Sequence, residues 1–521
     1  MFPGNYSDHA PDRPAVLLAG SGKVVTYAEL EERSCRLATL FRNNGLQPGD
    51  RVAIFSGCHE RYFEVVWAVL RCGLYLVPVN ANLTVDEAAF VIGDSGARLL
   101  VASADKHEIA GELTQKLDTV ERFLMFDDSC DGFELYQKAI AAHEALRPER
   151  EPLGEIMLYS SGTTGRPKGV WHPLSGRDVK EGWDGMDVQW GIPAGIDEST
   201  VCLVGGALYF GGPLIIGMWT QAYGGTVVVQ ERFDAEEMLA IIDRHKVTHG
   251  FFVPTMFVRL LRLPEDVRAR YDISSMRCMA HAAAPCSAVI KRQMISWFGP
   301  IVEEYYTASE EHGLTWITTR EWEERPGSVG RAHFGKIHVV DDAGNPLSAG
   351  ELGNIYFSGG KVFDYWKDPE KTQSSRLPGG LATTGDIGYV DEAGYLYLAD
   401  RKDFTVISGG INIYPKEIED CLIAHPEVND VVVFGVPDPD FGEAVKAIVE
   451  PARRDADPAA LAEELIAFCR AHLAHFKCPK SVDLIETMPR EETGKLKKRQ
   501  LRDAYWAQTG SVSPVSSITG S

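Results

Sequence analysis

The sequence predicts an α/β protein with a large N-terminal domain and a small C-terminal α/β domain. Strand-like apolar runs alternate with helix-like segments along most of the 521 residues, and this repetition favours parallel sheets joined by crossover helices. Between residues 335 and 400, turn signals such as the one at 342–346 separate short alternating runs, which predicts a small β-rich unit. A second α/β pattern after residue 403 predicts the C-terminal domain.

Hairpin and capping signals define the first elements. Residues 20–23 separate two apolar runs, which predicts a hairpin. Thr26 with Glu29, and Thr84 with Glu87, have the spacing of capping boxes, so each pair is expected to begin a helix. Further strands are expected at 51–55, 74–79, 225–229, 248–253, 276–283 and, as the last of this domain, 301–306. Further helices are expected at about 60–71, 235–244, 256–263 and 287–297. In the second domain we expect helices at 417–424 and 458–473 and strands at 428–436, 444–449 and 481–485.

Net charge, apolar runs and cysteine spacing argue against several classes of protein. The net charge of −22 argues against nucleic acid as a general partner. No apolar run reaches about 18 residues, so we expect no membrane span, although peripheral membrane contact stays open. The first residues lack a basic region followed by an apolar core, so no signal peptide is expected. The ten cysteines include no Cys-x-x-Cys pair, which fits reduced thiols in the cytoplasm. The oligomeric state is left open, a dimer included.

Residues 159–169 (YSSGTTGRPKG) have the composition of a polyphosphate-binding loop. Glycines let backbone N–H groups approach an anion closely, hydroxyls add donors, and Lys168 supplies a positive charge. The run is not the common P-loop, because Pro167 stands where that motif requires glycine. On composition alone, an ordinary polar surface loop remains an alternative.

The same run resembles the phosphate-binding signature of the acyl-adenylate-forming superfamily. That superfamily includes acyl- and aryl-CoA synthetases, firefly luciferase and the adenylation domains of peptide synthetases. Five further segments match it in the same order: 282–285 (AAAP), 304–310 (EYYTASE), 383–386 (TTGD), 400–403 (DRKD) with 408–415 (SGGINIYP), and 489–495 (PREETGK). Each alone has an ordinary reading, such as a tight turn or a solvated charged face. Together they indicate the family, in its acyl-CoA synthetase branch.

The resemblance implies a nucleotide site for ATP. The residues expected to bind its phosphates are Ser160, Ser161, Gly162, Thr163, Thr164, Gly165 and Lys168. The residues expected around adenine, ribose and α-phosphate are Ala283, Ala284, Tyr306, Thr307, Ser309, Asp386 and Arg401. The family usually has glycine at the position of Thr307, near the acyl carboxylate, so its side chain is expected to narrow or reorient the acid pocket.

The resemblance also implies the catalytic groups and a moving domain. The expected catalytic residues are Lys495, Glu310, Thr163 and Lys168, with Glu310 binding Mg²⁺. Gly409 and Gly410 would pass close to the pantetheine arm of coenzyme A, and Asp403 would be the hinge. The expected boundaries are 1–402 for the adenylate-forming domain, 403–510 for the mobile C-terminal domain, and 511–521 for a disordered tail.

The implied reaction is ATP-dependent activation of a carboxylic acid as acyl-AMP, followed by transfer to coenzyme A. Phe210 stands where the family often has histidine, which favours a fatty or other apolar acid. Aromatic candidates for the acyl pocket are Trp171, Trp183, Trp190, Tyr209, Phe210, Phe251 and Phe252, of which about half are expected to be plain core. The alternatives are an acyl-AMP ligase that loads a carrier protein, an aryl-acid CoA ligase and a luciferase-type oxygenase. An inactive nucleotide-binding regulator would have lost Lys495 or Glu310, and both are present.

Overall fold

The computed structural model describes residues 2–160, 167–183, 191–490 and 496–508. Several predicted residues therefore lie outside the described residues: Ser161, Gly162, Thr163, Thr164, Gly165, Trp190, Lys495 and the tail 511–521. Within the described ranges, none of the helices has both the length and the apolar character that crossing a bilayer requires.

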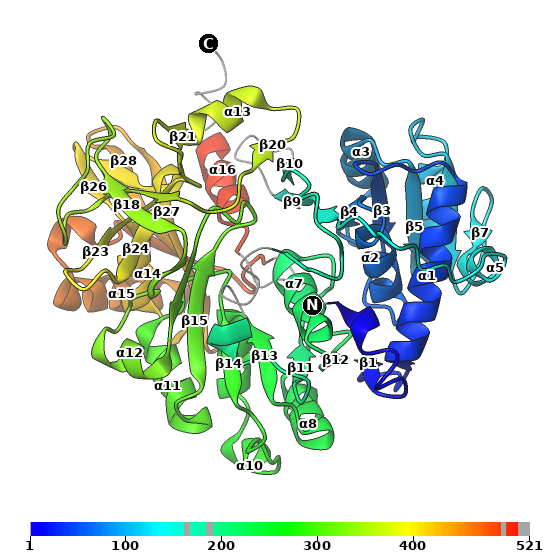
Figure 1. The fold of residues 1–521 in the computed structure, drawn as a ribbon. Coiled ribbons are helices and arrows are strands. Elements are labelled where there is room, and N and C mark those ends of the chain that lie inside the picture. The colour runs from blue at the N-terminus through cyan, green and yellow to red at the C-terminus, as the bar shows by residue number, and fades with distance from the viewer. Residues whose placement is uncertain (1, 161–166, 184–190, 491–495, 509–521) are drawn as a thin grey trace.

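The largest sheet forms the centre of the molecule and is parallel in its middle (Figure 1). Its described strands are, in spatial order, β17 (Arg331–Phe334), β16 (Leu314–Ile317), β15 (Val302–Thr307), β14 (Cys278–His281), β13 (His249–Phe252), β11 (Val201–Val204), β12 (Thr226–Val229), β1 (Pro14–Leu18) and β2 (Val24–Thr26). Its helices are α6 (Ile192–Ala194), α7 (Gly211–Ala222), α8 (Ala235–His245), α9 (Pro254–Leu261), α10 (Glu265–Arg268), α11 (Ala288–Phe298) and α12 (Thr319–Glu324). The prediction that 301–306 is the last strand was wrong, because β16 and β17 continue the sheet antiparallel to β15.

A second parallel sheet, blue and cyan in Figure 1, is built from residues 51–156. Its described strands are β7 (Glu134–Leu135), β6 (Arg122–Phe126), β5 (Leu99–Ser103), β3 (Arg51–Phe55), β4 (Tyr75–Val79) and β8 (Glu155–Ile156). Its helices are α1 (Tyr27–Asn43), α2 (Tyr62–Leu70), α3 (Val85–Ser95), α4 (His107–Leu113) and α5 (Tyr136–Ala141). Both predicted capping boxes are confirmed, since Thr26 and Thr84 cap α1 and α3.

The N-terminal part also contains two small antiparallel sheets. The predicted β-rich unit contains β18 (Lys336–Val340), β19 (Gly353–Ser358), β21 (Arg376–Leu377), β22 (Leu381–Ala382), β23 (Asp386–Val390) and β24 (Leu396–Arg401). The other sheet pairs β9 (Leu158–Ser160) with β10 (Lys168–Trp171), and β10 with β20 (Asp364–Tyr365). Helix α13 (Pro369–Ser374) follows β20.

The C-terminal part of the described chain has a core of its own, formed by apolar side chains between Val406 and Leu484. Its strands are β25 (Val406–Ser408), β26 (Ile411–Ile413), β27 (Val428–Asp438), β28 (Gly442–Pro451) and β29 (Ser481–Leu484). Its helices are α14 (Pro415–Leu422), α15 (Pro458–His472) and α16 (Lys498–Gln508). The predicted α/β class, with parallel sheets and a separate C-terminal domain, is confirmed.

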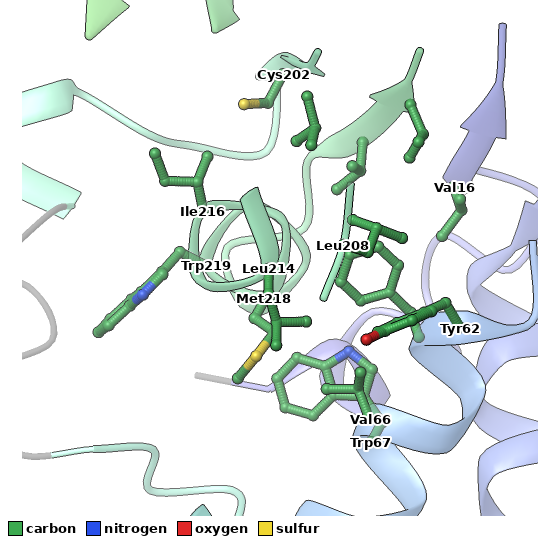
Figure 2. Close-up of a cluster of buried hydrophobic side chains, with 14 of the residues drawn as sticks. Val16, Tyr62, Val66, Trp67, Cys202, Leu208, Leu214, Ile216, Met218 and Trp219 are labelled. Carbon is green, nitrogen blue, oxygen red and sulfur yellow. The ribbon is translucent and has the colours of Figure 1, made fainter. Parts of the chain in front are cut away.

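Helices α2 and α7 pack face to face and join the two parallel sheets (Figure 2). Leu214 and Met218 of α7 lie against Val66 and Trp67 of α2. The Trp67 indole Nε1 donates a hydrogen bond of 2.7 Å to Gln221 at the end of α7. These contacts lie along the middle and end of α7, whose first residue, Gly211, follows the predicted wall residue Phe210.

Candidate active site

The predicted phosphate loop joins two strands of an antiparallel ladder. Ser160 at the end of β9 lies opposite Lys168 at the start of β10. The chain between them therefore connects neighbouring strands, whereas a P-loop leads from a strand into a helix. A Cβ atom at Gly169 would lie 2.5 Å from the Met157 methyl group and 3.0 Å from the Tyr159 ring, so a larger residue there would force these side chains to shift.

Lys168 has an anionic partner. Its Nζ forms an ion pair with Asp368, 200 positions further along the chain, and the two side chains are 17% and 28% exposed. Burial acts to raise the pKa of Asp368, but the hydrogen bonds from Lys168 and the Lys371 N–H, together with the charges of both lysines, outweigh burial and lower that pKa. The positive charge of Lys168, which the sequence predicts to bind phosphate, is therefore already neutralised in part by Asp368.

The predicted adenine and ribose residues lie at the carboxyl ends of neighbouring parallel strands. Ala283 and Ala284 follow β14, and Tyr306 lies near the end of β15, its neighbour. This edge is where open α/β sheets bind ligands. Ala283 has a φ of +71°, a conformation that non-glycine residues adopt rarely and that is typical of functional sites.

The Asp386 carboxylate accepts three hydrogen bonds. Its Oδ2 accepts hydrogen bonds from the Tyr306 hydroxyl at 2.6 Å and from the Thr384 hydroxyl at 2.8 Å. Its Oδ1 accepts one from Arg401 Nε at 3.2 Å. Burial and the neighbouring carboxylate raise the pKa of Tyr306 well above its usual value, so the phenol keeps its proton and acts as a donor.

This arrangement limits how Asp386 can bind ribose. A carboxylate offers about four acceptor positions, and Tyr306, Thr384 and Arg401 occupy three of them. If Asp386 binds ribose as the sequence predicts, one acceptor position is available for a hydroxyl, and a second hydroxyl would require Arg401 or Thr384 to move. Arg401 is the more mobile candidate, since its side chain is 45% exposed.

Glu310 is a buried carboxylate, 7% exposed, with Oε1 accepting a 2.7 Å hydrogen bond from the Tyr365 hydroxyl. The neighbouring Glu311 is bound instead by Lys361 Nζ at 3.1 Å, and Lys361 also pairs with Glu155 at 2.9 Å. Carboxylate oxygens are the ligands that Mg²⁺ prefers. Glu310, oriented by Tyr365, therefore fits the predicted metal ligand better than Glu311.

Thr307 engages its hydroxyl with the backbone. Its Oγ1 donates a hydrogen bond of 2.8 Å to the Gly313 carbonyl. The hydroxyl group of the side chain that replaces the family's glycine hydrogen is therefore already engaged within the chain. Ser309, two residues on, is half-buried.

The predicted hinge is bound by the last helix. Asp403 lies in a short 3-10 turn, Lys402–Phe404, directly after β24. Its carbonyl accepts a hydrogen bond of 2.8 Å from Arg502 of α16, and the Arg502 guanidinium lies 5.4 Å from the centre of the Phe404 ring. A contact from the small domain thus sets the backbone at the predicted pivot.

Gly409 and Gly410 form the turn between β25 and β26, with φ values of +58° and +80°. The Gly409 N–H donates to the Phe441 carbonyl at 2.8 Å. The Phe441 ring is 50% exposed, and Lys480 Nζ lies 4.1 Å from its centre. A glycine turn, an exposed ring and a lysine therefore share one surface of the small domain.

The aromatic acyl-pocket candidates divide into groups. Phe251 and Phe252 belong to the buried core of β13, at 4% and 0% exposure. Trp171 lines a different cavity of about 580 Å³ beside β20. Phe210 caps α7, half-buried, with its ring 4.6 Å from that of Tyr209, so this pair remains a wall candidate.

Sequence reasoning did not identify Asp368 or Tyr365, the partners of Lys168 and Glu310. The only local signal was the Asp368-Pro369 pair, which predicts a helix start. Nothing in the spacing of residues 365 and 368 indicates contact with groups 55 and 200 positions away.

Comparison with known proteins agrees with this geometry. The family model "AMP-binding enzyme" matches residues 5–366, and the model "AMP-binding enzyme C-terminal domain" matches residues 417–495. A feruloyl-CoA synthase from Amycolatopsis sp. is 33% identical, covering 94% of this chain and 96% of the relative. The fatty acid–[acyl-carrier-protein] ligase ScoC of Streptomyces coeruleorubidus is 30% identical over 97% and 96%. The ATP-bound structure of MatB from Rhodopseudomonas palustris is 28% identical, with a TM-score of 0.82 over 97% of this chain and 99% of MatB.

The family models span most of the chain, and the relatives match it along almost its whole length. The order of matched segments and the arrangement of Tyr306, Asp386 and Arg401 are consistent with that assignment. The chain belongs to the AMP-binding, acyl-adenylate-forming superfamily, in its acyl-CoA ligase branch, and is an AMP-forming acid–thiol ligase.

Proposed function

We propose that the enzyme converts a carboxylic acid to an acyl-adenylate with ATP and passes the acyl group to coenzyme A. One observation supports this proposal: the groups assigned to the nucleotide form two hydrogen-bonded sets that meet at segment 306–310, at the end of strand β15 of the central sheet. Asp386 links Tyr306 to Arg401. Segment 365–368 links Glu310 to Lys168, through Tyr365 and Asp368.

In the first step, a carboxylate oxygen of the acid attacks the α-phosphorus of ATP and pyrophosphate leaves. The two reactants repel each other because both are anions. Lys168, and Lys495 by resemblance, would offset that repulsion, while Asp386 and Tyr306 hold the nucleoside in place. Mg²⁺ held by Glu310 would neutralise part of the phosphate charge.

In the second step, the thiolate of coenzyme A attacks the acyl carbon and AMP leaves. We propose that the small domain turns about Asp403 between the steps and brings Gly409 and Gly410 to the thiol path. The half-exposed Phe441 ring and Lys480 beside that turn suit a planar, phosphate-bearing nucleotide such as the one coenzyme A carries.

For the acid we propose an apolar substrate, either a fatty acid or an aryl acid. The wall candidates Tyr209 and Phe210 are aromatic, and Thr307 turns its hydroxyl to Gly313, so these walls favour apolar contact. The names of two relatives, a feruloyl-CoA synthase and a fatty acid–[acyl-carrier-protein] ligase, point to an aryl acid and a fatty acid.

A second acceptor has specific support. The similarity to a fatty acid–carrier-protein ligase over 97% of the chain makes the phosphopantetheine arm of a carrier protein the alternative to coenzyme A. Both acceptors present the same thiol arm. The distinction therefore rests on whether free coenzyme A is used.

A panel of acids tests this proposal. Fatty acids of graded length, cinnamic acids and dicarboxylic acids are incubated with ATP, Mg²⁺ and either coenzyme A or a phosphopantetheinylated carrier protein. AMP and thioester are measured for each combination. We expect AMP and acyl-CoA from apolar acids only. Preference for dicarboxylic acids would refute the apolar assignment, and thioester on the carrier protein alone would refute coenzyme A as acceptor.

A further inference from the structure

The carboxylate of Asp368 makes two separate contacts. Its Oδ2 pairs with Lys168 Nζ. Its Oδ1 accepts a hydrogen bond of 2.9 Å from the Lys371 N–H, which caps helix α13 (Pro369–Ser374). Capping needs only a side-chain oxygen, and serine and asparagine perform it as well as aspartate does. The negative charge is therefore not explained by the cap.

The backbone around Asp368 is fixed relative to Lys168. The Trp366 N–H donates to the Gly169 carbonyl at 2.8 Å, which continues the pairing of β20 with β10. The Asp368 N–H donates to the Tyr365 carbonyl at 3.0 Å, and the Asp368 carbonyl accepts from the Thr372 hydroxyl at 3.0 Å. The carboxylate thus has a set position at the base of the phosphate hairpin.

We propose that Asp368 is the counter-ion that limits how strongly Lys168 binds the phosphate groups of ATP and pyrophosphate. This inference rests on the proposed function, in which Lys168 contacts phosphate. An incoming polyphosphate competes with the carboxylate for the same ammonium group. The enzyme must release pyrophosphate after the first step, and a lysine already paired binds that product less tightly.

Asp368 is therefore a positioning residue that acts through Lys168. A purely structural role predicts that loss of the carboxylate weakens phosphate binding or leaves it unchanged. A counter-ion role predicts the opposite sign, because the freed ammonium group binds anions more tightly. The two roles therefore predict opposite changes in phosphate affinity. A damaged fold would not increase that affinity.

Asp368→Asn tests this directly, since asparagine keeps the capping oxygen and loses the charge. Binding of inorganic pyrophosphate and of α,β-methylene-ATP is measured by isothermal titration calorimetry, without turnover. An ion pair of this exposure contributes up to about 1 kcal/mol, which corresponds to about fivefold tighter binding of both ligands. Asp368→Ser, which also caps without charge, is expected to give the same change.

Two further variants test whether Asp368 affects phosphate binding through Lys168. In a Lys168→Ala background, Asp368→Asn should give little further change, because the partner is gone. Asp364→Asn is the matched control: it removes a charge from the same segment, but its partner is Arg376 at 2.9 Å, and we expect unchanged binding. Thermal melting of each variant verifies folding.

The outcomes distinguish failure of the proposed function from failure of the role proposed for Asp368. Wild-type protein that binds neither ligand would overturn the proposed function and this inference together. Tight binding by the wild type, with equal or weaker binding by Asp368→Asn and Asp368→Ser, would overturn the inference alone. The same would follow if the gain persisted in full without Lys168.

Discussion

Replacing Asp386 by asparagine tests the ribose site most closely. The carboxylate accepts from Tyr306, Thr384 and Arg401 and has about one acceptor position left for a ribose hydroxyl. Asparagine keeps one oxygen but turns two N–H donors toward groups that are themselves donors. We therefore expect the remaining ribose contact to be lost.

The magnitude follows from the type of contact. A hydrogen bond to a charged group contributes roughly 2 kcal/mol, which corresponds to about a 30-fold rise in the KM for ATP. Stability should fall as well, because Asp386 loses its charge beside Arg401; that pair is 12% and 45% exposed and contributes no more than about 1 kcal/mol.

The assay is acid-dependent ATP–pyrophosphate exchange with ATP, 2′-deoxy-ATP and 3′-deoxy-ATP. With one of the two deoxy analogues, the wild type should already show most of the 30-fold loss, and Asp386→Asn should add little to it. A loss of equal size for ATP and for both analogues would refute the reasoning, because Asp386 would then not contact a ribose hydroxyl.

Three further changes test the hinge, the metal ligand and a half-buried acid. Asp403→Pro fixes φ at the pivot, so pyrophosphate exchange should persist while thioester formation falls; equal retention of both would exclude this residue as the hinge. Tyr365→Phe removes the 2.7 Å hydrogen bond to Glu310, and the Mg²⁺ concentration for half-maximal exchange should rise about tenfold; an unchanged requirement contradicts that assignment. Burial raises the pKa of Glu303 from 4.5 to about 7, so the folded state holds this proton more tightly and stability is lost as the pH rises from 4.5 towards 7. Glu303→Gln should therefore stabilise the protein by about 2 kcal/mol at pH 8 and by almost nothing at pH 4; equal melting shifts at both pH values would contradict the assigned pKa.

Local signals in the sequence predicted the early elements well, because capping and strand periodicity act over a few residues. Thr26 and Thr84 each cap a helix as predicted. Strand β16 (Leu314–Ile317) was missed because a run of four residues, three of them apolar, does not distinguish an added antiparallel strand from a buried turn. Helix α16 was missed because its first residues read as a solvated basic face.

The sequence predicted only those residues of the candidate site that belong to a recognisable motif. Tyr306, Asp386 and Arg401 come from three separate segments, and the structure brings them into direct contact. The partners that tune the charged groups, Asp368 and Tyr365, depend on tertiary pairing of β20 with β10. No periodicity or spacing encodes that pairing, so only the fold could show it.

Oxygen transfer from acid to AMP tests the central claim most directly. If the carboxylate attacks the α-phosphorus and the thiol then attacks the acyl carbon, one carboxylate oxygen stays on phosphorus. An acid labelled with ¹⁸O in both carboxyl oxygens, incubated with ATP, Mg²⁺ and coenzyme A, should give AMP carrying one ¹⁸O and an acyl-CoA carrying the other, in equal amounts, as measured by mass spectrometry. Unlabelled AMP, or formation of ADP with labelled inorganic phosphate, would contradict an acyl-adenylate intermediate.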